Sequence, residues 1–400
     1  MDPAADAGPI EPFLATPGPS NVPEAVRRAM SGPVIHHRSG EFSGIFRDVC
    51  ERAPALLGMA GDLAVLTCSG TGAMQAVIEN LTRPGDHVLV ASFGRFGQRW
   101  AEIATALDRR VSHLELEWGL RPDPAAIAEH AASHPDAVLL LTTHSETSTG
   151  AVSDAEAIAA AVHAVRPELM LGIDAISSGA ALRFEFDAWG FDAVVSGSQK
   201  AWMLPPGLAF AGLSARAEAQ MRELLSGTGP HPYYLDLARA LDRQREAATT
   251  PWTPAHVLVQ GLQAALDLIE AEGMVARDAR HRRHGRATRA ALAALGVEGF
   301  SPDHDSSGIL TAFEVPDGLT ADGIRGYLRD RAGITTAGGQ ARLKGRIVRI
   351  GHCGWFGDGH LLTTIAQLER ALAAGGHRVE PGAGIAAAEA ALHATTEVLA

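Results

Sequence analysis

The sequence predicts an α/β protein in which a large domain with a mostly parallel, doubly wound sheet of the seven-stranded type precedes a smaller α+β domain. Three observations predict this. Short apolar runs alternate with amphipathic segments of helical length between residues 64 and 225. A second, shorter alternation follows residue 308. The length of 400 residues suits two domains rather than one. Such alternation is typical of a parallel sheet covered by helices on both faces.

Apolar runs that end at Gly, Ser, Pro or Asp set the order of elements in the first part of the chain. They predict strands at residues 64–67, 87–91, 111–115, 137–142, 169–174, 192–196 and 208–213. Amphipathic periodicity predicts helices at residues 24–31, 41–57, 97–107, 124–132, 154–164 and 215–225, and one more that ends at residue 81. The proline-rich residues 13–23 form an extended loop, either ordered or flexible.

The C-terminal part opens with a long helical stretch at residues 256–289, and whether Gly273 breaks it is left open. Strands at 308–313 and 346–351 then alternate with helices at 320–331 and 360–374. Residues 376–400 are Ala-rich and helix-prone, without a functional cue. We therefore expect an N-terminal arm at residues 1–20 that joins the small domain, a large domain at residues 21–254, and a linking helix with the small domain at residues 255–400.

The composition limits the classes of molecule that this protein can bind and indicates the cellular compartment in which it functions. The formal net charge of −12 argues against non-specific binding to nucleic acids or anionic membranes. The three cysteines, Cys50, Cys68 and Cys353, form no CxxC and no metal-like cluster, so we expect no metal site and a reducing compartment. The N-terminus lacks the apolar stretch of a signal peptide, and no apolar run is long enough to span a bilayer. A cytoplasmic protein is the expectation.

One lysine stands at the end of a predicted buried strand. The apolar run at residues 193–195 breaks at Ser-Gly-Ser-Gln and delivers Lys200, which apolar residues follow again. Burial would lower the pKa of this amine and free its lone pair for attack on a carbonyl. The alternative is a lysine that extends from the strand end into solvent, and the segment alone does not separate the two.

Three other polar segments also follow predicted strands. Ser69-Gly70-Thr71-Gly72 opens a helix, where backbone N–H groups and the helix dipole can bind a phosphate, although such residues are also ordinary N-caps. Asp174 ends a buried strand; it either caps a turn or pairs with a protonated ring nitrogen, and a metal there would lack companion ligands. The hydroxyl-rich residues 144–150 contact a ligand or form a solvated loop.

Taken together, these segments favour one cofactor. Parallel strands end at the same edge of a sheet, where ligands of α/β proteins bind. An anion-binding turn, a carboxylate and a lysine at that edge match the needs of pyridoxal phosphate, which requires a phosphate site, an acid partner for its pyridine nitrogen and an amine for its Schiff base.

The chain also resembles fold-type I pyridoxal-phosphate enzymes of the class V aminotransferase group, and within it the alanine–glyoxylate and serine–pyruvate aminotransferases. The matching stretches follow the family order from about residue 13 to 375. They are TPGPSNVP (16–23), SGTGAM (69–74), HSETSTG (144–150), DAISS (174–178), GSQK (197–200), TPA (253–255) and RIVRIGH (346–352).

The resemblance implies roles for individual residues. Lys200 would form the Schiff base and shuttle the proton, and Asp174 would hold the pyridinium proton. The phosphate would be bound by Ser69, Gly70, Thr71 and Gln199, and from the other subunit of a homodimer by Thr253. Thr147 or Ser148 would contact the side of the cofactor that bears its phenolic oxygen. Arg349 would bind the substrate α-carboxylate as a bidentate partner, and Ser20 is also assigned to the substrate.

Two positions depart from the family pattern. Phe96 stands where the family often stacks a Trp on the cofactor ring, and Thr250 stands where some relatives have a Tyr three residues before the Thr of TPA; by this resemblance both are assigned to the cofactor. Residues 36–38 (His-His-Arg) resemble a polar stretch near the active-site entrance of some relatives, with an ordinary solvated loop as the alternative.

The expected activity is transfer of an amino group from a small L-amino acid, of the alanine or serine type, to a small 2-oxo acid such as glyoxylate or pyruvate. The amino donor is not fixed by the sequence. Alternatives on the same scaffold are aminotransfer with phosphonate or phosphoserine substrates, for which Arg38 and Arg95 are candidate cations, and a side-chain lyase. A cysteine desulfurase is disfavoured because Cys353 follows the Arg349 strand too closely. A non-catalytic scaffold subunit is the remaining alternative.

Overall fold

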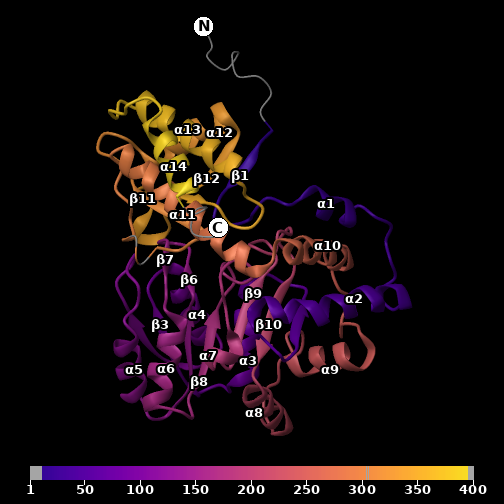
Figure 1. Ribbon diagram of the computed structural model, residues 1–400. Coiled ribbons are helices and arrows are strands. Elements are labelled where there is room, and N and C mark those ends of the chain that lie inside the picture. Colours follow the sequence, from indigo (N-terminus) through magenta and orange to yellow (C-terminus); the bar gives the residue numbers. More distant parts are fainter. Residues whose placement is uncertain (1–10, 303, 305, 395–400) are drawn as a thin grey trace.

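The computed structural model describes residues 11–302, 304 and 306–394. Its large domain is built on a seven-stranded sheet with the strand order β2-β10-β9-β8-β5-β3-β4, which confirms the predicted α/β fold (Figure 1). The strands are β2 (Leu63–Leu66), β3 (His87–Ser92), β4 (Arg110–Glu115), β5 (Ala137–Thr143), β8 (Met170–Asp174), β9 (Ala193–Gly197) and β10 (Ala209–Leu213). A two-stranded ribbon joins β6 (Ser145–Glu146) to β7 (Ala151–Val152).

Both faces of this sheet are buried. Along β3, Val88 and Val90 pack into one hydrophobic core with helices α3, α4, α8 and α9, whereas Leu89 and Ala91 pack into another with α2, α5, α6 and α10. Neighbouring side chains of a strand point to opposite faces, so a strand that is apolar throughout needs helices on both sides. The helices from residue 24 to residue 272 are α1 (Glu24–Met30), α2 (Gly40–Arg52), α3 (Gly70–Leu81), α4 (Arg95–Ala106), α5 (Pro124–Ala132), α6 (Ala155–Val165), α7 (Phe186–Trp189), α8 (Ala215–Ser226), α9 (Leu237–Ala247) and α10 (His256–Glu272).

Strand direction brings the polar segments together. β4, β3, β5, β8 and β9 run parallel, and β10 is antiparallel to both β9 and β2. The parallel strands therefore end at one edge, where Asp174 closes β8 and Lys200 follows β9. The candidate site lies at this edge.

The small domain contains a four-stranded sheet in the order β1-β12-β13-β11, shown in the upper part of Figure 1. β1 lies parallel to β12, so the segment that starts at residue 13 joins this sheet. The domain boundaries expected at residues 20 and 254 stay predictions. Its elements are β1 (Phe13–Ala15), β11 (Leu310–Glu314), β12 (Ile334–Gly338), β13 (Ile347–Gly351), α12 (Ala321–Ala332), a 3₁₀ turn (Ala341–Leu343), α13 (Asp358–Ala374) and α14 (Ala383–His393).

Several elements differ from the sequence expectation. The single helix expected at residues 41–57 ends at Arg52 and continues as a 3₁₀ turn, Ala53–Leu57, at whose start Pro54 supplies no N–H for an α-helical bond. The stretch at 256–289 is two helices, because Gly273 adopts φ 76° between α10 and α11 (Met274–Ala294). β1, β12 and α9 were not expected. Within the described part of the chain, no helix has the length and apolar character needed to cross a membrane.

Candidate active site

A pocket of about 450 Å³ opens at the carboxyl edge of the large sheet. Its lining brings together eight of the residues assigned from the sequence and includes four others. The lining residues are Ser69, Gly70, Thr71, Phe96, Arg99, Ser145, Thr147, Asp174, Ile176, Ser177, Gln199 and Lys200. They come from the segments after β2, β5, β8 and β9 and from helix α4, which is the arrangement that parallel strands impose.

The first turn of α3 forms an anion-binding corner of the pocket. Ser69 is the N-cap residue, yet its side chain makes no capping hydrogen bond. The first N–H groups of a helix have no partner within it, so those of Gly70 and Thr71 are available to an anion. A Cβ at Gly70 would lie 2.6 Å from the Ile176 side chain, so a larger residue there would have to displace Ile176. Arg99 also lines the pocket here, and its guanidinium donates to the Thr71 hydroxyl at 3.2 Å.

Lys200 is buried, and its amine donates a hydrogen bond to the Pro17 carbonyl oxygen at 2.9 Å. Burial lowers the pKa of Lys200, and the nearby carboxylate of Asp174 acts in the opposite direction. The structure therefore places this amine inside the protein, whereas the alternative from the sequence was a lysine extended into solvent. Its Nζ lies 5.9 Å from the centre of the Phe96 ring.

Asp174 faces the same pocket from the end of β8. Its Oδ1 accepts a hydrogen bond from the Ile176 N–H at 2.7 Å. Burial, together with the negative charge of Glu146, raises the pKa of Asp174 to about 7, although the Ile176 hydrogen bond and the positive charge of Lys200 act in the opposite direction. A carboxyl group with a pKa near neutrality can hold a negative charge next to a basic nitrogen at physiological pH, because the cation stabilises it.

Two charged residues of this region were not assigned a role from the sequence. Arg99 lines the pocket and also lies over the Phe96 ring at 4.9 Å. Glu146 is fully buried and accepts hydrogen bonds from the backbone N–H groups of Phe96, Gly97 and Ser148 and from the Ser148 hydroxyl. Burial raises the pKa of Glu146, whereas the four hydrogen-bond donors around it favour its carboxylate form. Arg99 follows Phe96 by about one helical turn, so the helical periodicity could have predicted that Arg99 lies on the same side of the helix as Phe96.

The hydroxyl-rich loop divides between pocket and interior. Thr147 lines the pocket, whereas the Ser148 hydroxyl donates to Glu146 and accepts from the Arg95 N–H, outside the lining. His144 is buried against Phe184, its Nδ1 is 2.9 Å from the Ser178 hydroxyl, and burial lowers its pKa to about 4. His144 is therefore neutral, and its contacts with Ser178 and Phe184 hold the start of the loop against the protein interior.

Arg349 approaches the site from β13 of the small domain. Its Nε donates to the Gly338 carbonyl at 2.9 Å and its Nη1 to the Thr147 carbonyl at 2.6 Å. Burial lowers the pKa of Arg349 to about 10, so the side chain remains a cation at neutral pH. The two bonds orient the guanidinium toward the loop that carries Thr147.

Ser20 and Gln199 lie beside Lys200. Ser20 donates its hydroxyl to the Lys200 carbonyl at 2.6 Å, and its N–H donates to the Gln199 carbonyl at 2.9 Å, so its side chain holds the lysine turn in place. Gln199 lines the pocket, and its Oε1 is buried without a hydrogen-bond partner among the described residues. This oxygen is an acceptor, so it is available to a ligand group that donates a hydrogen bond.

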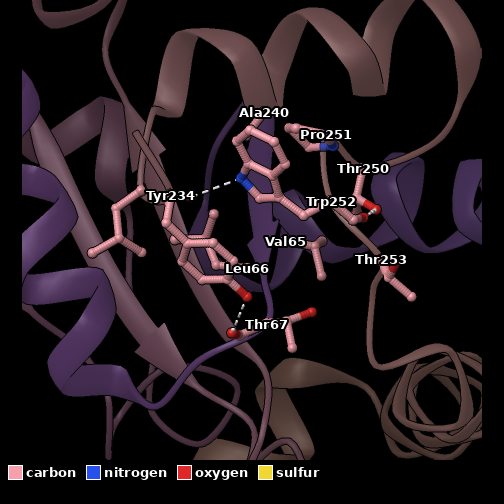
Figure 2. Close-up of a pocket in the computed structure, with 10 residues that line it drawn as sticks. Val65, Leu66, Thr67, Tyr234, Ala240, Thr250, Pro251, Trp252 and Thr253 are labelled. Carbon is pink, nitrogen blue, oxygen red and sulfur yellow. Dashed lines mark hydrogen bonds between the residues drawn. The ribbon is translucent and has the colours of Figure 1, made fainter. Parts of the chain in front are cut away.

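Thr250 and Thr253 lie apart from Lys200. They line a second hollow together with Thr67, Tyr234 and Trp252 (Figure 2). The Thr250 hydroxyl donates to the Trp252 carbonyl at 2.6 Å. Within one chain, neither threonine therefore contributes to the pocket that contains Lys200.

Known proteins match this chain over nearly its whole length. The family model described as aminotransferase class-V matches residues 13–351. The chain belongs to the class-V aminotransferases. A serine–glyoxylate aminotransferase of Methylorubrum extorquens is 34% identical, with 97% of this chain and 98% of the relative aligned. A protein named as the small subunit of a soluble hydrogenase, from Synechococcus sp., is 41% identical over 95% of this chain and 98% of the relative.

A solved structure extends the comparison to three dimensions. The ureidoglycine–glyoxylate aminotransferase of Bacillus subtilis superposes with a TM-score of 0.89 at 28% identity and covers 96% of this aminotransferase and 99% of its own chain. Class-V aminotransferases are pyridoxal-phosphate enzymes, and the residues that line the Lys200 pocket can be compared with the needs of that cofactor. The first N–H groups of α3, a Ser69 hydroxyl that makes no capping hydrogen bond, a buried carboxyl group and a buried amine at one pocket fit it.

Proposed function

We propose that this chain binds pyridoxal phosphate in the Lys200 pocket and moves an amino group from a small L-amino acid to a small 2-oxo acid such as glyoxylate or pyruvate. The single observation that carries the proposal is the shared pocket of a buried lysine amine, a buried carboxyl group and a helix N-terminus. Relatives named as serine–glyoxylate and L-aspartate–glyoxylate aminotransferases support the substrate class.

The residues would divide the work as follows. Ser69, Gly70, Thr71 and Gln199 would hold the phosphate, Phe96 would cover the ring and Asp174 would pair with the pyridine nitrogen. The bound cofactor supplies an electron sink for the substrate carbon next to the carboxylate.

Lys200 would move the substrate proton, because its amine is buried and its lowered pKa favours the neutral base. Arg349 would hold the substrate carboxylate through charge-assisted hydrogen bonds, with Thr147 fixing its orientation.

The test is covalent capture. The chain is incubated with pyridoxal phosphate, treated with borohydride and digested, and the modified peptide is identified by mass spectrometry. We expect the label on Lys200 and none in Lys200→Ala. Amino donors such as alanine, serine and aspartate are then screened with glyoxylate and pyruvate by detecting the 2-oxo acid that forms. A Lys200→Ala protein that still transaminates would disprove the assignment.

The relative named as a hydrogenase subunit favours a second candidate, in which the chain is a scaffold subunit of a larger assembly. The same capture experiment separates the two. A folded chain that neither takes up pyridoxal phosphate nor releases a 2-oxo acid supports the scaffold.

Phosphonate aminotransfer and cysteine desulfuration are less well supported. Arg38 is bound to the Thr249 hydroxyl and the Thr250 and Pro251 carbonyls, and Arg95 pairs with Glu102, which reduces their value as phosphonate-binding cations. Cys353 is buried, and burial raises the pKa of its thiol to about 11, so it is not the reactive thiolate that a desulfurase needs.

We further propose a homodimer in which Thr253 of each chain reaches the phosphate site of the other. The position of Thr253 away from the Lys200 pocket of its own chain supports this arrangement. Sedimentation should report a dimer, and Thr253→Ala should weaken retention of pyridoxal phosphate during dialysis. A monomer with full retention would contradict it.

A further inference from the structure

Helix α11 sends a buried arginine to the turn that carries Lys200. The Arg277 side chain is 1% exposed. Its Nη2 donates to the Ala201 carbonyl at 2.6 Å and its Nε to the Ala180 carbonyl at 2.5 Å. Its Nη1 pairs with Glu272 at 2.6 Å. Every nitrogen of this guanidinium is therefore used, and one bond ends on the residue directly after Lys200.

The same carboxylate binds a second arginine of α11. Arg280 contacts Glu272 through Nε at 2.5 Å and Nη2 at 3.0 Å. Its other contacts are the carbonyl oxygens of Phe356 at 2.9 Å and Gly354 at 3.3 Å. These two residues lie in the segment that follows β13, the strand of Arg349. Glu272 thus links the lysine turn to the segment behind the arginine strand.

The backbone around Lys200 needs such support. Met203 and Ala180 both adopt left-handed φ angles of 60° and 61°, which disfavour residues with a Cβ and persist only where surrounding contacts hold them. Arg277 holds one of these residues directly and the other through the 201–203 turn. Burying a cation is unfavourable, and burial lowers the pKa of Arg277, so packing alone would be served better by an apolar side chain.

We propose that Arg277 is a positioning residue for Lys200. By fixing the Ala201 carbonyl, Arg277 sets the direction in which the lysine side chain leaves the backbone. Through Glu272 and Arg280 it also fixes the position of the lysine relative to the strand that carries Arg349. This inference rests on the proposed function, because it assumes that the Lys200 amine reacts with an aldehyde cofactor.

The test compares Arg277→Met, Arg277→Lys and the control Arg282→Met, which removes a half-exposed arginine from the same helix. The first readout uses cofactor-free protein: the rate at which an amine-specific acylating reagent modifies Lys200 is followed across pH by mass spectrometry. The second is the rate of covalent attachment of pyridoxal phosphate to Lys200, captured by borohydride. We expect Arg277→Met to slow attachment at least tenfold and to change the pH profile of acylation, Arg277→Lys to recover part of both, and Arg282→Met to match the natural chain.

A second variant keeps the proposal testable if Arg277→Met does not fold. Glu272→Gln keeps the side-chain volume but removes the shared anion, and it should slow attachment about threefold and speed amide hydrogen exchange in residues 198–204. Attachment at the natural rate in a folded Arg277→Met or in Glu272→Gln would overturn the proposal, as would equal slowing by Arg282→Met. If the natural chain itself does not attach pyridoxal phosphate at Lys200, the proposed function fails instead.

Discussion

At the scale of single residues, burial sets the acid–base chemistry of the pocket. Lys200 and Asp174 carry opposite charges when ionised, and burial disfavours the ionised form of each. A bound cofactor with an aldehyde and a ring nitrogen would give both groups partners. In the cofactor-free protein, the buried Lys200 and Asp174 therefore do not stabilise the fold, and we expect their value to lie in binding the cofactor.

Asp174→Asn should stabilise the cofactor-free protein at high pH. The pKa of Asp174 is about 7 in the folded chain against 3.8 for an ordinary aspartate, so the folded state binds more protons and its stability falls as the pH rises from about 4 to 7. At pH 8 the penalty approaches ~4 kcal/mol, at 1.36 kcal/mol for each pKa unit.

Melting temperatures of both proteins between pH 4 and 8 check this expectation. The advantage of Asp174→Asn should be largest at pH 8 and vanish toward pH 4, and a pH-independent difference would contradict it. Retention of pyridoxal phosphate should change in the opposite sense, because the amide cannot pair with a protonated ring nitrogen.

Arg349→Ala should raise the KM for amino acids strongly. The loss of a charge-assisted hydrogen bond costs about 1.5–3 kcal/mol, or roughly 10- to 100-fold. Arg349→Lys should recover only part, because an ammonium does not match the carboxylate with two parallel donors. Steady-state kinetics measure the effect, with the exposed Arg346→Ala as the control. An unchanged KM would place carboxylate binding elsewhere.

At the scale of elements, helix α4 depends on one buried carboxylate. Glu146 accepts from the N–H groups of Phe96 and Gly97, in the first turn of the helix that also carries Arg99. An anion at a helix N-terminus is favoured by the helix dipole. A Cβ at Gly94 would overlap the Glu146 side chain, so the loop and the helix approach each other closely at this point. Glu146 therefore positions the residues that cover the pocket.

Glu146→Gln should destabilise the protein by about 1–3 kcal/mol, because the amide nitrogen would face an N–H donor and leave it unpaired. Denaturant unfolding measures the loss. Glu102→Gln, on an exposed residue of α4, is the matched control and should have little effect. Equal stability of the two variants would show that the four hydrogen bonds of Glu146 are dispensable.

Elements formed by local pattern were predictable, and elements formed by distant pairing were not. The strand ends at Asp174 and before Lys200 follow from apolar runs that burial on both faces requires. β1 is three residues long and exists because it pairs with β12, over 300 residues away. Glu146 and Arg277 were missed for a related reason, since their partners are backbone groups whose positions no sequence pattern states.

At the scale of the whole molecule, the segment at residues 13–20 contacts Lys200 and connects the small sheet to the large domain. Residues 13–15 form β1 in the small sheet, the Pro17 carbonyl accepts from the Lys200 amine, and Ser20 holds the Lys200 carbonyl. The chain then enters α1 of the large domain (Figure 1). Arg349 contacts Thr147 across the same boundary. The site is therefore built between two domains, and its geometry depends on how they meet.

Within this segment, Gly18 lies directly against the Lys200 side chain. A Cβ there would overlap Nζ of Lys200, and the φ of 149° disfavours any residue with a side chain. Gly18→Ala should therefore displace the amine and reduce borohydride-captured pyridoxal phosphate on Lys200 at least tenfold. Gly44→Ala is the control, because a Cβ at that exposed helical position meets no atom within 4 Å. Peptide mass spectrometry measures the captured fraction. Full capture by a folded Gly18→Ala would mean that the segment moves away when the cofactor binds, and that the lysine does not depend on the arm from the small domain.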